Sequence, residues 1–207
     1  LDVNNPERSE SALDLVQRAK NYSEENPLYV FAIGTMTNIA TALLIDPSIS
    51  KNIVIVWVGG HSFEYEDTNE YNLKSDLSAS KIVLESSAPL ILVPCMGVAS
   101  KLLVTTDECV EAFEGKDALC EYILDYLHKM APDAYKFKNM KRIIWDGLAP
   151  ALFLQENQEL VKYRVENRPT ISEDMHWVFN DESKKILYAY DIDVEKLKKH
   201  MLDTISK

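Results

Sequence analysis

Three short, uninterrupted apolar runs limit most strongly what this chain can fold into. They span residues 28–33, 53–58 and 89–93. The runs are rich in β-branched residues and show no alternation of polar and apolar positions, which predicts strands buried on both faces. Two of the runs end at glycine, at Gly34 and at the pair Gly59–Gly60, and polar residues follow at once.

Amphipathic segments separate these runs and predict helices. Residues 9–25 carry apolar side chains at helical spacing, residues 39–44 follow Thr37 or Asn38 as N-cap, and residues 76–86 begin beside a polar cap. An alternation of strand and helix requires right-handed crossovers between parallel strands. The sequence therefore predicts an α/β fold: one domain over residues 1–207, with a Rossmann-like, open, mainly parallel sheet and helices on both faces.

The second half of the chain has weaker signals. From Thr106 onward the chain looks helical in two or three segments, one of them residues 118–130, and an apolar approach at 141–144 leads into a helix after Trp145 and Asp146. Residues 175–179 and 185–190 predict a hairpin, and residues 194–205 predict a final helix.

Composition removes several classes of function. Lysine and arginine number 22 against 33 aspartates and glutamates, so the formal charge of −11 disfavours nucleic acid and anionic membranes as partners. The apolar runs are too short to span a bilayer, and no targeting segment is recognisable at the start, so we expect a cytoplasmic protein. Cys95, Cys109 and Cys120 lack metal-binding spacing and are expected as reduced thiols, mostly in the core.

Polar residues gather where a ligand site is expected. In open parallel sheets, ligands bind beyond the carboxyl ends of the strands. Thr35, Thr37, Asn38, the loop after Gly60 and Met96 all follow predicted strands. The sequence therefore places a candidate site at this edge of the sheet.

Glu70 and Asn72 form one candidate pair on the loop 68–76. If this segment is extended, the two side chains point to the same face while Tyr71 turns away, and together they suit a polyhydroxylated ligand. The alternative is a solvated loop in which Asn72 makes a local turn.

Trp145 and Asp146 pose a similar choice. Asp146 is either the cap of the following helix or an oxygen ligand for a metal ion, and Trp145 is either a core residue or a surface on which a base stacks. His61, which follows Gly60, either assists a leaving group or is a plain polar loop residue.

Four segments together resemble the nucleoside hydrolase family, whose members cleave the N-glycosidic bond of ribonucleosides. They are GTMTNIATALLIDP (34–47), VWVGGH (56–61), NEYNLKSD (69–76) and WDGLAPAL (145–152). They are similar to the family's G-x-[LM]-T-N-[IL]-A, strand-Gly-Gly, E-[FY]-N-x-x-x-D and [HW]-D-x-[LI]-A elements, in the same order.

The resemblance implies a calcium-assisted hydrolase that acts on small-molecule nucleosides. It implies that the Thr37 carbonyl and the Asp146 carboxylate bind Ca²⁺, with Asp146 also catalytic, and that Glu70 and Asn72 grip the ribose hydroxyls. Asp76 is expected only to cap the helix that follows it.

The remaining substrate contacts implied by the resemblance are Val58, His61 and Trp145. A tryptophan at 145, where many members have histidine, is similar to the purine-preferring branch. The resemblance also implies a homo-oligomer, a dimer or a tetramer.

The chain departs from the family pattern in two places. The family begins with a strand that ends in a D-x-D-x-x-x-D-D cluster, which supplies most calcium ligands, and this chain looks like the carboxy-terminal two-thirds of the fold. We therefore expect weak or absent calcium binding and an uncovered apolar sheet edge. Glu64 also lies where many members have an asparagine for the ribose, which bears on specificity.

A rival hypothesis is a catalytically impaired module that binds nucleosides or ribose, or acts as an oligomerisation partner. It keeps Glu70 and Asn72 without the metal cluster. A dinucleotide-binding fold is disfavoured because no G-x-G-x-x-G follows a predicted strand.

Overall fold

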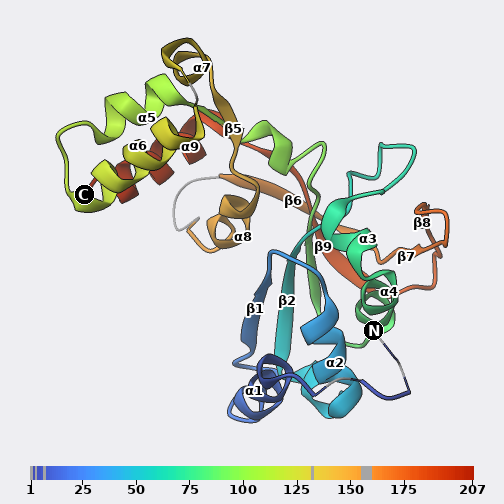
Figure 1. The fold of residues 1–207 in the computed structure, drawn as a ribbon. Helices are drawn as coiled ribbons and strands as arrows, with labels where there is room; N and C mark the ends of the chain where they lie inside the picture. Colours follow the sequence, from blue (N-terminus) through green and yellow to red (C-terminus); the bar gives the residue numbers. More distant parts are fainter. Residues whose placement is uncertain (1, 3, 7, 132, 155–159) are drawn as a thin grey trace. The chain divides into compact units, whose positions relative to one another are not determined.

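The computed structural model describes residues 2, 4–6, 8–131, 133–154 and 160–207 (Figure 1). The chain divides into two compact units. The first comprises Leu1–Val98 and Lys162–Asp191, and the second comprises Ala99–Val161 and Ile192–Lys207.

A five-stranded sheet, in the order β1-β2-β3-β9-β6, forms the centre of the first unit. Its strands are β1 (Leu28–Ala32), β2 (Ile53–Val58), β3 (Leu90–Val93), β6 (Val161–Asn167) and β9 (Lys185–Ile192). Parallel pairing joins β1 to β2, β2 to β3, and β3 to β9. The predicted α/β fold with a mainly parallel sheet is therefore confirmed.

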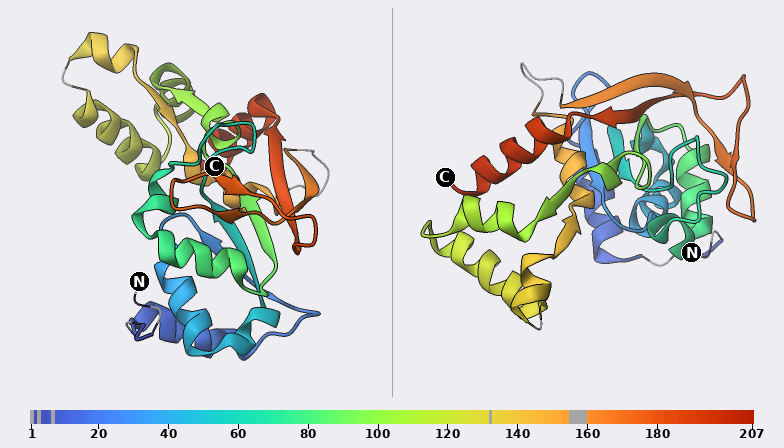
Figure 2. Two further views of the ribbon diagram at one scale, coloured as in Figure 1. Left: turned by 90° about the vertical axis from the view of Figure 1, so that its right-hand side faces the viewer. Right: turned by 90° about the horizontal axis from the view of Figure 1, so that it is seen from above.

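Helices of the first unit pack on this sheet as the amphipathic segments predict. They are α1 (Glu10–Ala19), α2 (Thr37–Ile45), α3 (Tyr71–Ser75) and α4 (Leu77–Glu85), and a 3₁₀ turn, η1 (Pro47–Lys51), follows α2. Residues of α1, α2 and α4 share one buried cluster with Ile53, Ile55 and Trp57 of β2. Figure 2 shows the ribbon of these helices and of the sheet from two further sides. Burial of this cluster is the main stabilising contribution to the unit.

Strand β1 differs from the prediction of burial on both faces. Leu28 and Val30 pack against the helix-covered core, whereas Tyr29 and Phe31 remain 43% and 44% exposed. Side chains of a strand alternate between the two faces, so only one face of β1 lies in this core. The prediction of a fully buried strand was wrong here.

The predicted hairpin of residues 175–179 with 185–190 was also wrong. A short strand, β8 (Trp177–Val178), pairs antiparallel with β7 (Thr170–Ile171), and β9 instead lies beside β3 in the central sheet. Ile186, Tyr188 and Ala189 of β9 are buried, and a strand with that much buried apolar surface needs neighbours that cover it.

The second unit is mainly helical and contains an antiparallel pair of strands. The strands are β4 (Leu103–Thr105) and β5 (Lys141–Ile143). The helices are α5 (Thr106–Phe113), α6 (Ala118–Met130), α7 (Ala134–Lys138), α8 (Leu148–Ala151) and α9 (Val194–Ile205), with 3₁₀ turns η2 (Ala99–Lys101) and η3 (Trp145–Gly147). The helices predicted at 118–130 and 194–205 are confirmed.

The cysteines are placed largely as expected. Cys95 and Cys120 are buried, and Cys109 is half-buried. Burial raises the pKa of the Cys109 thiol to about 11, so this thiol stays protonated near neutral pH.

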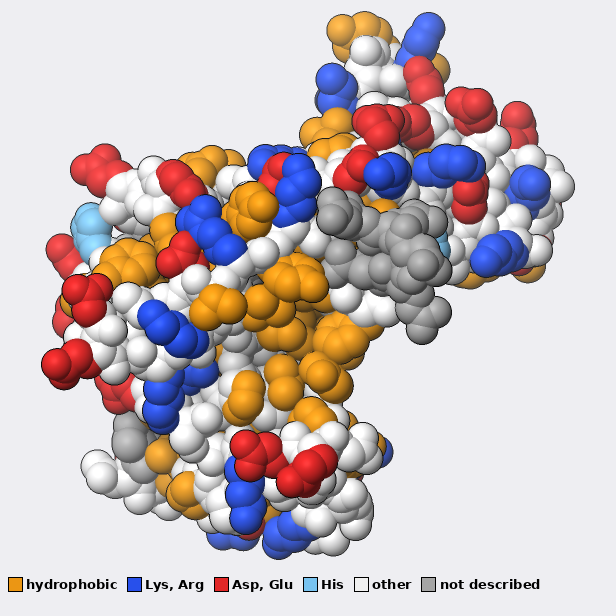
Figure 3. Space-filling view, turned by 180° about the vertical axis from the view of Figure 1, so that it is seen from behind, with side chains coloured by type: hydrophobic (Ala, Val, Ile, Leu, Met, Phe, Trp, Pro, Cys, Tyr) orange, Lys and Arg blue, Asp and Glu red, His pale blue; other side chains and the backbone are white. Residues whose placement is uncertain are grey.

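Within the part of the chain that the structure describes, no helix is long and apolar enough to cross a membrane. On the face shown in Figure 3, lysine and arginine side chains are interspersed with aspartates and glutamates.

Candidate functional site

The loops that follow β2 and β3 lie side by side, as expected for the carboxyl edge of a parallel sheet. The Cys95 amide donates to the Gly60 carbonyl at 2.8 Å, and the Ser62 amide donates to the Met96 carbonyl at 3.0 Å. These two hydrogen bonds therefore hold the loops together at the sheet edge where the sequence predicts a ligand site.

Thr37 is the first residue of α2, but it does not cap the helix with its side chain. The N-cap residue is Met36, and no side-chain cap bond forms there, so the prediction of a Thr37 or Asn38 cap was wrong. The Thr37 hydroxyl instead donates to the Asp76 carboxylate at 2.6 Å, and Asn38 accepts from the Ser9 hydroxyl at 2.9 Å. These hydrogen bonds connect the start of α2 to the starts of α4 and α1.

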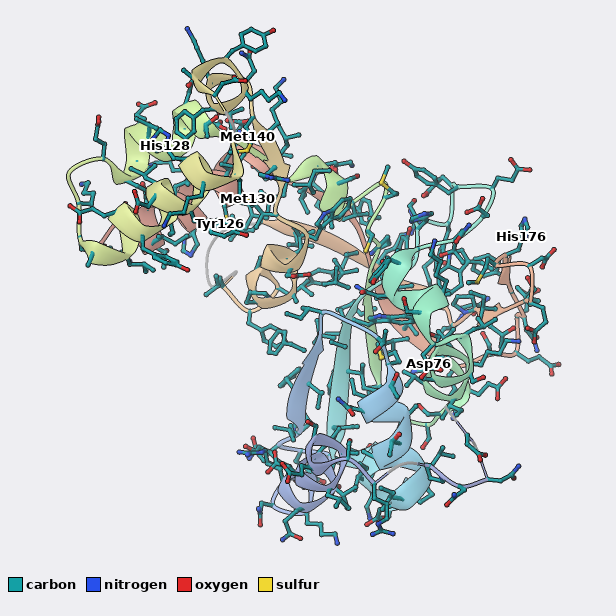
Figure 4. The ribbon with its side chains drawn as sticks, in the orientation of Figure 1. Asp76, Tyr126, His128, Met130, Met140 and His176 are labelled. Carbon is teal, nitrogen blue, oxygen red and sulfur yellow. The ribbon has the colours of Figure 1, made fainter. Side chains whose placement is uncertain are left out.

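Asp76 caps α4, as predicted (Figure 4). Its carboxylate accepts from the Ala79 amide at 3.0 Å in addition to the Thr37 hydroxyl. Burial by itself raises the pKa of Asp76, but the hydrogen bonds from Thr37 and Ala79 outweigh it and hold the pKa below its usual value. Asp76 is therefore ionised at neutral pH.

The glycine pair after β2 has two separate structural causes. A Cβ at Gly59 would overlap the indole nitrogen of Trp57, which leaves no room for a side chain. Gly60 has φ +68°, a conformation that disfavours residues with a Cβ, and a Cβ there would lie 2.5 Å from the Trp177 ring. The chain can turn into the site loop only with glycine at both positions.

Glu70 is buried and serves as the N-cap of α3. Its carboxylate accepts from the amides of Asn72 at 2.8 Å, Leu73 at 2.9 Å and Gly60 at 3.1 Å. A carboxylate has about four acceptor positions, so these bonds leave one position for a further donor. The expected extended conformation of residues 68–76 was wrong, because α3 begins at Tyr71.

Asn72 lies in the first turn of α3, close to the end of β2. Its side-chain nitrogen donates to the Val58 carbonyl at 3.4 Å, which is a weak bond. Tyr71 is 75% exposed and points away, as the sequence predicts. The structure thus brings Val58, Glu70 and Asn72 together at one strand end.

His61 is held through its backbone. Its amide donates to the Thr68 hydroxyl at 2.7 Å, and its carbonyl accepts from the Trp177 indole at 3.0 Å. Its ring nitrogen Nδ1 is buried without a hydrogen-bond partner among the described residues. Buried polar atoms are usually paired, so this ring atom is available to a ligand, and the role of His61 in substrate binding stays a prediction.

Trp145 and Asp146 lie in η3 of the second unit. Asp146 does not cap α8, whose N-cap is Gly147. Partial burial is the cause that raises the pKa of the Asp146 carboxyl above its usual value. Trp145 is 36% exposed. A carboxylate with a raised pKa is typical of functional sites.

The described residues do not fit a calcium site by themselves. Among them, no group of three or more histidine, cysteine, aspartate or glutamate residues is placed to hold a metal ion. Calcium takes six to eight oxygen ligands, and Thr37 and Asp146 offer two groups between them. The assignment of these two residues to calcium stays a prediction.

The sequence did not single out Trp177 and Thr68 as parts of this site. Both form hydrogen bonds with the backbone of His61, although both lie outside the four motif segments. The one local signal in the sequence that could have drawn attention to Trp177 is that a tryptophan stands in a polar, hairpin-like segment.

Known proteins resemble this chain in sequence and in fold. Probable uridine nucleosidase 2 from Arabidopsis thaliana is 32% identical over 133 residues, which are 61% of this chain and 40% of that protein. The fold is similar to that of a plant nucleoside hydrolase, with TM-score 0.77 and 17% identity over 98% of this chain and 68% of that one. It is also similar to a purine-preferring ribonucleoside hydrolase from Gardnerella vaginalis, with TM-score 0.73 and 20% identity over 97% and 66%.

The chain thus spans less than half of the uridine nucleosidase and about two thirds of each solved structure. Residues 2–199, which contain all four motif segments, match the family described as inosine-uridine preferring nucleoside hydrolase. The chain belongs to this nucleoside hydrolase family.

Proposed function

We propose that the protein hydrolyses the N-glycosidic bond of ribonucleosides and releases ribose and the free base. The observation that carries this proposal is the buried Glu70 carboxylate beside Asn72 at the carboxyl end of β2, in a chain of the nucleoside hydrolase family. In the reaction, water adds to C1′ and a carboxylate takes a proton from that water, while the C1′–N electron pair leaves with the base, which takes up a proton to become the free base.

Glu70 and Asn72 are assigned to the ribose. Three backbone amides fix the Glu70 carboxylate, so its remaining acceptor position is already oriented before a ribose hydroxyl arrives. The Asn72 amide adds a donor and an acceptor next to it. Such a fixed arrangement lowers the entropic cost of orienting the sugar.

Asp146 and Trp145 are assigned to water activation and to the leaving base. The raised pKa of Asp146 makes its carboxylate a better proton acceptor than an ordinary aspartate. The partly exposed Trp145 ring offers a flat surface for stacking, which favours purines because their rings are larger. Val58 and His61 complete the proposed substrate contacts.

The Ca²⁺ ion expected for this family requires oxygen ligands beyond Thr37 and Asp146. No step above is therefore assigned to a metal. A cytoplasmic homo-oligomer, a dimer or a tetramer, likewise stays a prediction.

A second candidate function is nucleoside binding without hydrolysis. The observation that favours it is the absence of a metal-holding group of three acidic or histidine residues among the described residues. Both functions use Glu70 and Asn72 in the same way, so they differ only in whether product forms.

Product analysis separates these functions. We expect the protein, incubated with inosine and calcium, to release free ribose and hypoxanthine in equal amounts, and to process inosine faster than uridine. The same incubation with a chelator reports the metal requirement. Saturable inosine binding without products would support the second candidate, and ribose 1-phosphate formed only with added phosphate would contradict hydrolysis.

A further inference from the structure

The β7–β8 hairpin contacts the loop after β2 at three points. The Trp177 indole donates to the His61 carbonyl at 3.0 Å, and the Thr68 amide donates to the Met175 carbonyl at 2.7 Å. The Trp177 ring also lies where a Cβ of Gly60 would be. His176, labelled in Figure 4, marks this hairpin.

Hydrogen bonds within the loop after β2 connect these contacts to Glu70. Thr68 accepts from the His61 amide through its hydroxyl at 2.7 Å and from the Glu70 amide through its carbonyl at 2.7 Å. The Gly60 amide donates to the Glu70 carboxylate at 3.1 Å. A continuous chain of bonds therefore leads from Trp177 to the carboxylate assigned to the ribose.

Met175 supplies a second, independent observation. Its φ is 63°, a left-handed conformation that is strained for a residue with a side chain. Such strain persists where surrounding contacts impose it, and it clusters near functional segments. In this structure the strained residue, Met175, is also the residue whose carbonyl accepts the hydrogen bond from the Thr68 amide.

We propose that Trp177 is a positioning residue for the candidate site. It fixes the Gly60–His61 turn from outside the motif segments, and through that turn it orients His61 and the Glu70 carboxylate toward the substrate. The role of these two residues in substrate binding rests on the proposed function, whereas the fixing of the turn does not.

The test removes the indole N–H, once with a bicyclic ring of similar size kept at position 177 and once with the smaller phenyl ring in its place. In Trp177→Phe, and in a variant with benzothienylalanine at 177, we expect the Gly60 and His61 amides to exchange hydrogen roughly tenfold faster, as loss of one buried hydrogen bond implies. Amides of Ile55 and Leu92 in the central strands are the internal reference. Unchanged exchange at Gly60 and His61 in the benzothienylalanine variant would overturn the proposal.

Phe179→Leu is the matched control. Phe179 and Trp177 both pack edge-on against Phe63, with ring centres 4.9 and 5.8 Å away, but Phe179 has no indole to bond His61. We expect this variant to leave exchange at Gly60 unchanged relative to the reference amides. Equal acceleration in both variants would mean that ring packing, and not the bond to His61, holds the turn.

Kinetics separate positioning from general stability. If nucleoside is hydrolysed, Trp177→Phe should raise KM for inosine several-fold, while global unfolding changes no more than in Phe179→Leu. An unchanged KM with faster local exchange would overturn the link to the substrate. Absence of hydrolysis in the unmodified protein would count against the proposed function alone, because the exchange measurement needs no activity.

Discussion

Gly60→Ala is expected to lower the free energy of unfolding by about 2–5 kcal/mol. The left-handed backbone at Gly60 costs a residue with a Cβ about 1–2 kcal/mol, and overpacking adds about 1–3 kcal/mol. The added methyl would lie 2.5 Å from the Trp177 ring and 2.9 Å from the Thr68 hydroxyl oxygen. Denaturant unfolding monitored by circular dichroism measures the change.

Two other glycines in the chain separate the backbone from the steric contribution. Gly115 has φ +69° with open space around it, so Gly115→Ala should cost only about 1–2 kcal/mol. Gly34 has no positive φ, and a methyl group added there would meet no neighbour within 4 Å, so Gly34→Ala should be neutral or slightly stabilising. Equal losses of unfolding free energy in Gly60→Ala and Gly115→Ala would contradict a steric contribution from the Trp177 ring.

Asp146→Asn is expected to lower kcat for ribose release from inosine by about 10²–10⁴-fold, the usual contribution of a general base. The substitution removes the proton-accepting group and keeps its size. The control is Glu121→Gln, which neutralises an exposed carboxylate in the same unit and should leave kcat unchanged. Normal turnover by Asp146→Asn would contradict a catalytic role.

The stability of the same variant shows whether the fold survives. Because the pKa of Asp146 is raised in the folded protein, its contribution to stability is fully present below the unfolded-state pKa and is lost as pH rises through the folded-state pKa. Asn avoids this loss, so the variant should be more stable near neutral pH by less than about 1 kcal/mol, since the residue is largely exposed. The gain should vanish in acid.

The central strands could be predicted because their signal is local. An unbroken apolar run such as Ile53–Val58 is stable only between neighbouring strands, so the sequence itself implies the sheet. The same holds for α6, whose bounds match the prediction. Both signals depend on residues within one segment.

Contacts between distant segments could not be predicted in this way. The bond from Trp177 to His61 joins residues 116 positions apart, and it depends on where the β7–β8 hairpin docks. The predicted hairpin of residues 175–190 was wrong for the same reason. The position of β9 is set by its pairing with β3, which is distant in sequence, and not by the strand that precedes β9 along the chain.

Glu70 shows how a correct candidate can have a different local structure from the one expected. The sequence pairs it with Asn72 through an extended backbone, whereas the structure does so through the first turn of a helix that Glu70 caps. Ser, Thr, Asp and Asn are the usual N-caps, so a glutamate in this position gave no helix signal.

The central claim is that Glu70 and Asn72 hold the ribose. Its most direct test is a titration of the protein with inosine, followed by NMR at the Asn72 and Leu73 amides, which donate to Glu70. We predict saturable shifts at both amides that Glu70→Gln weakens at least tenfold, about 1.4 kcal/mol. Inosine binding that leaves both amides unperturbed, or no inosine binding at all, would contradict the claim.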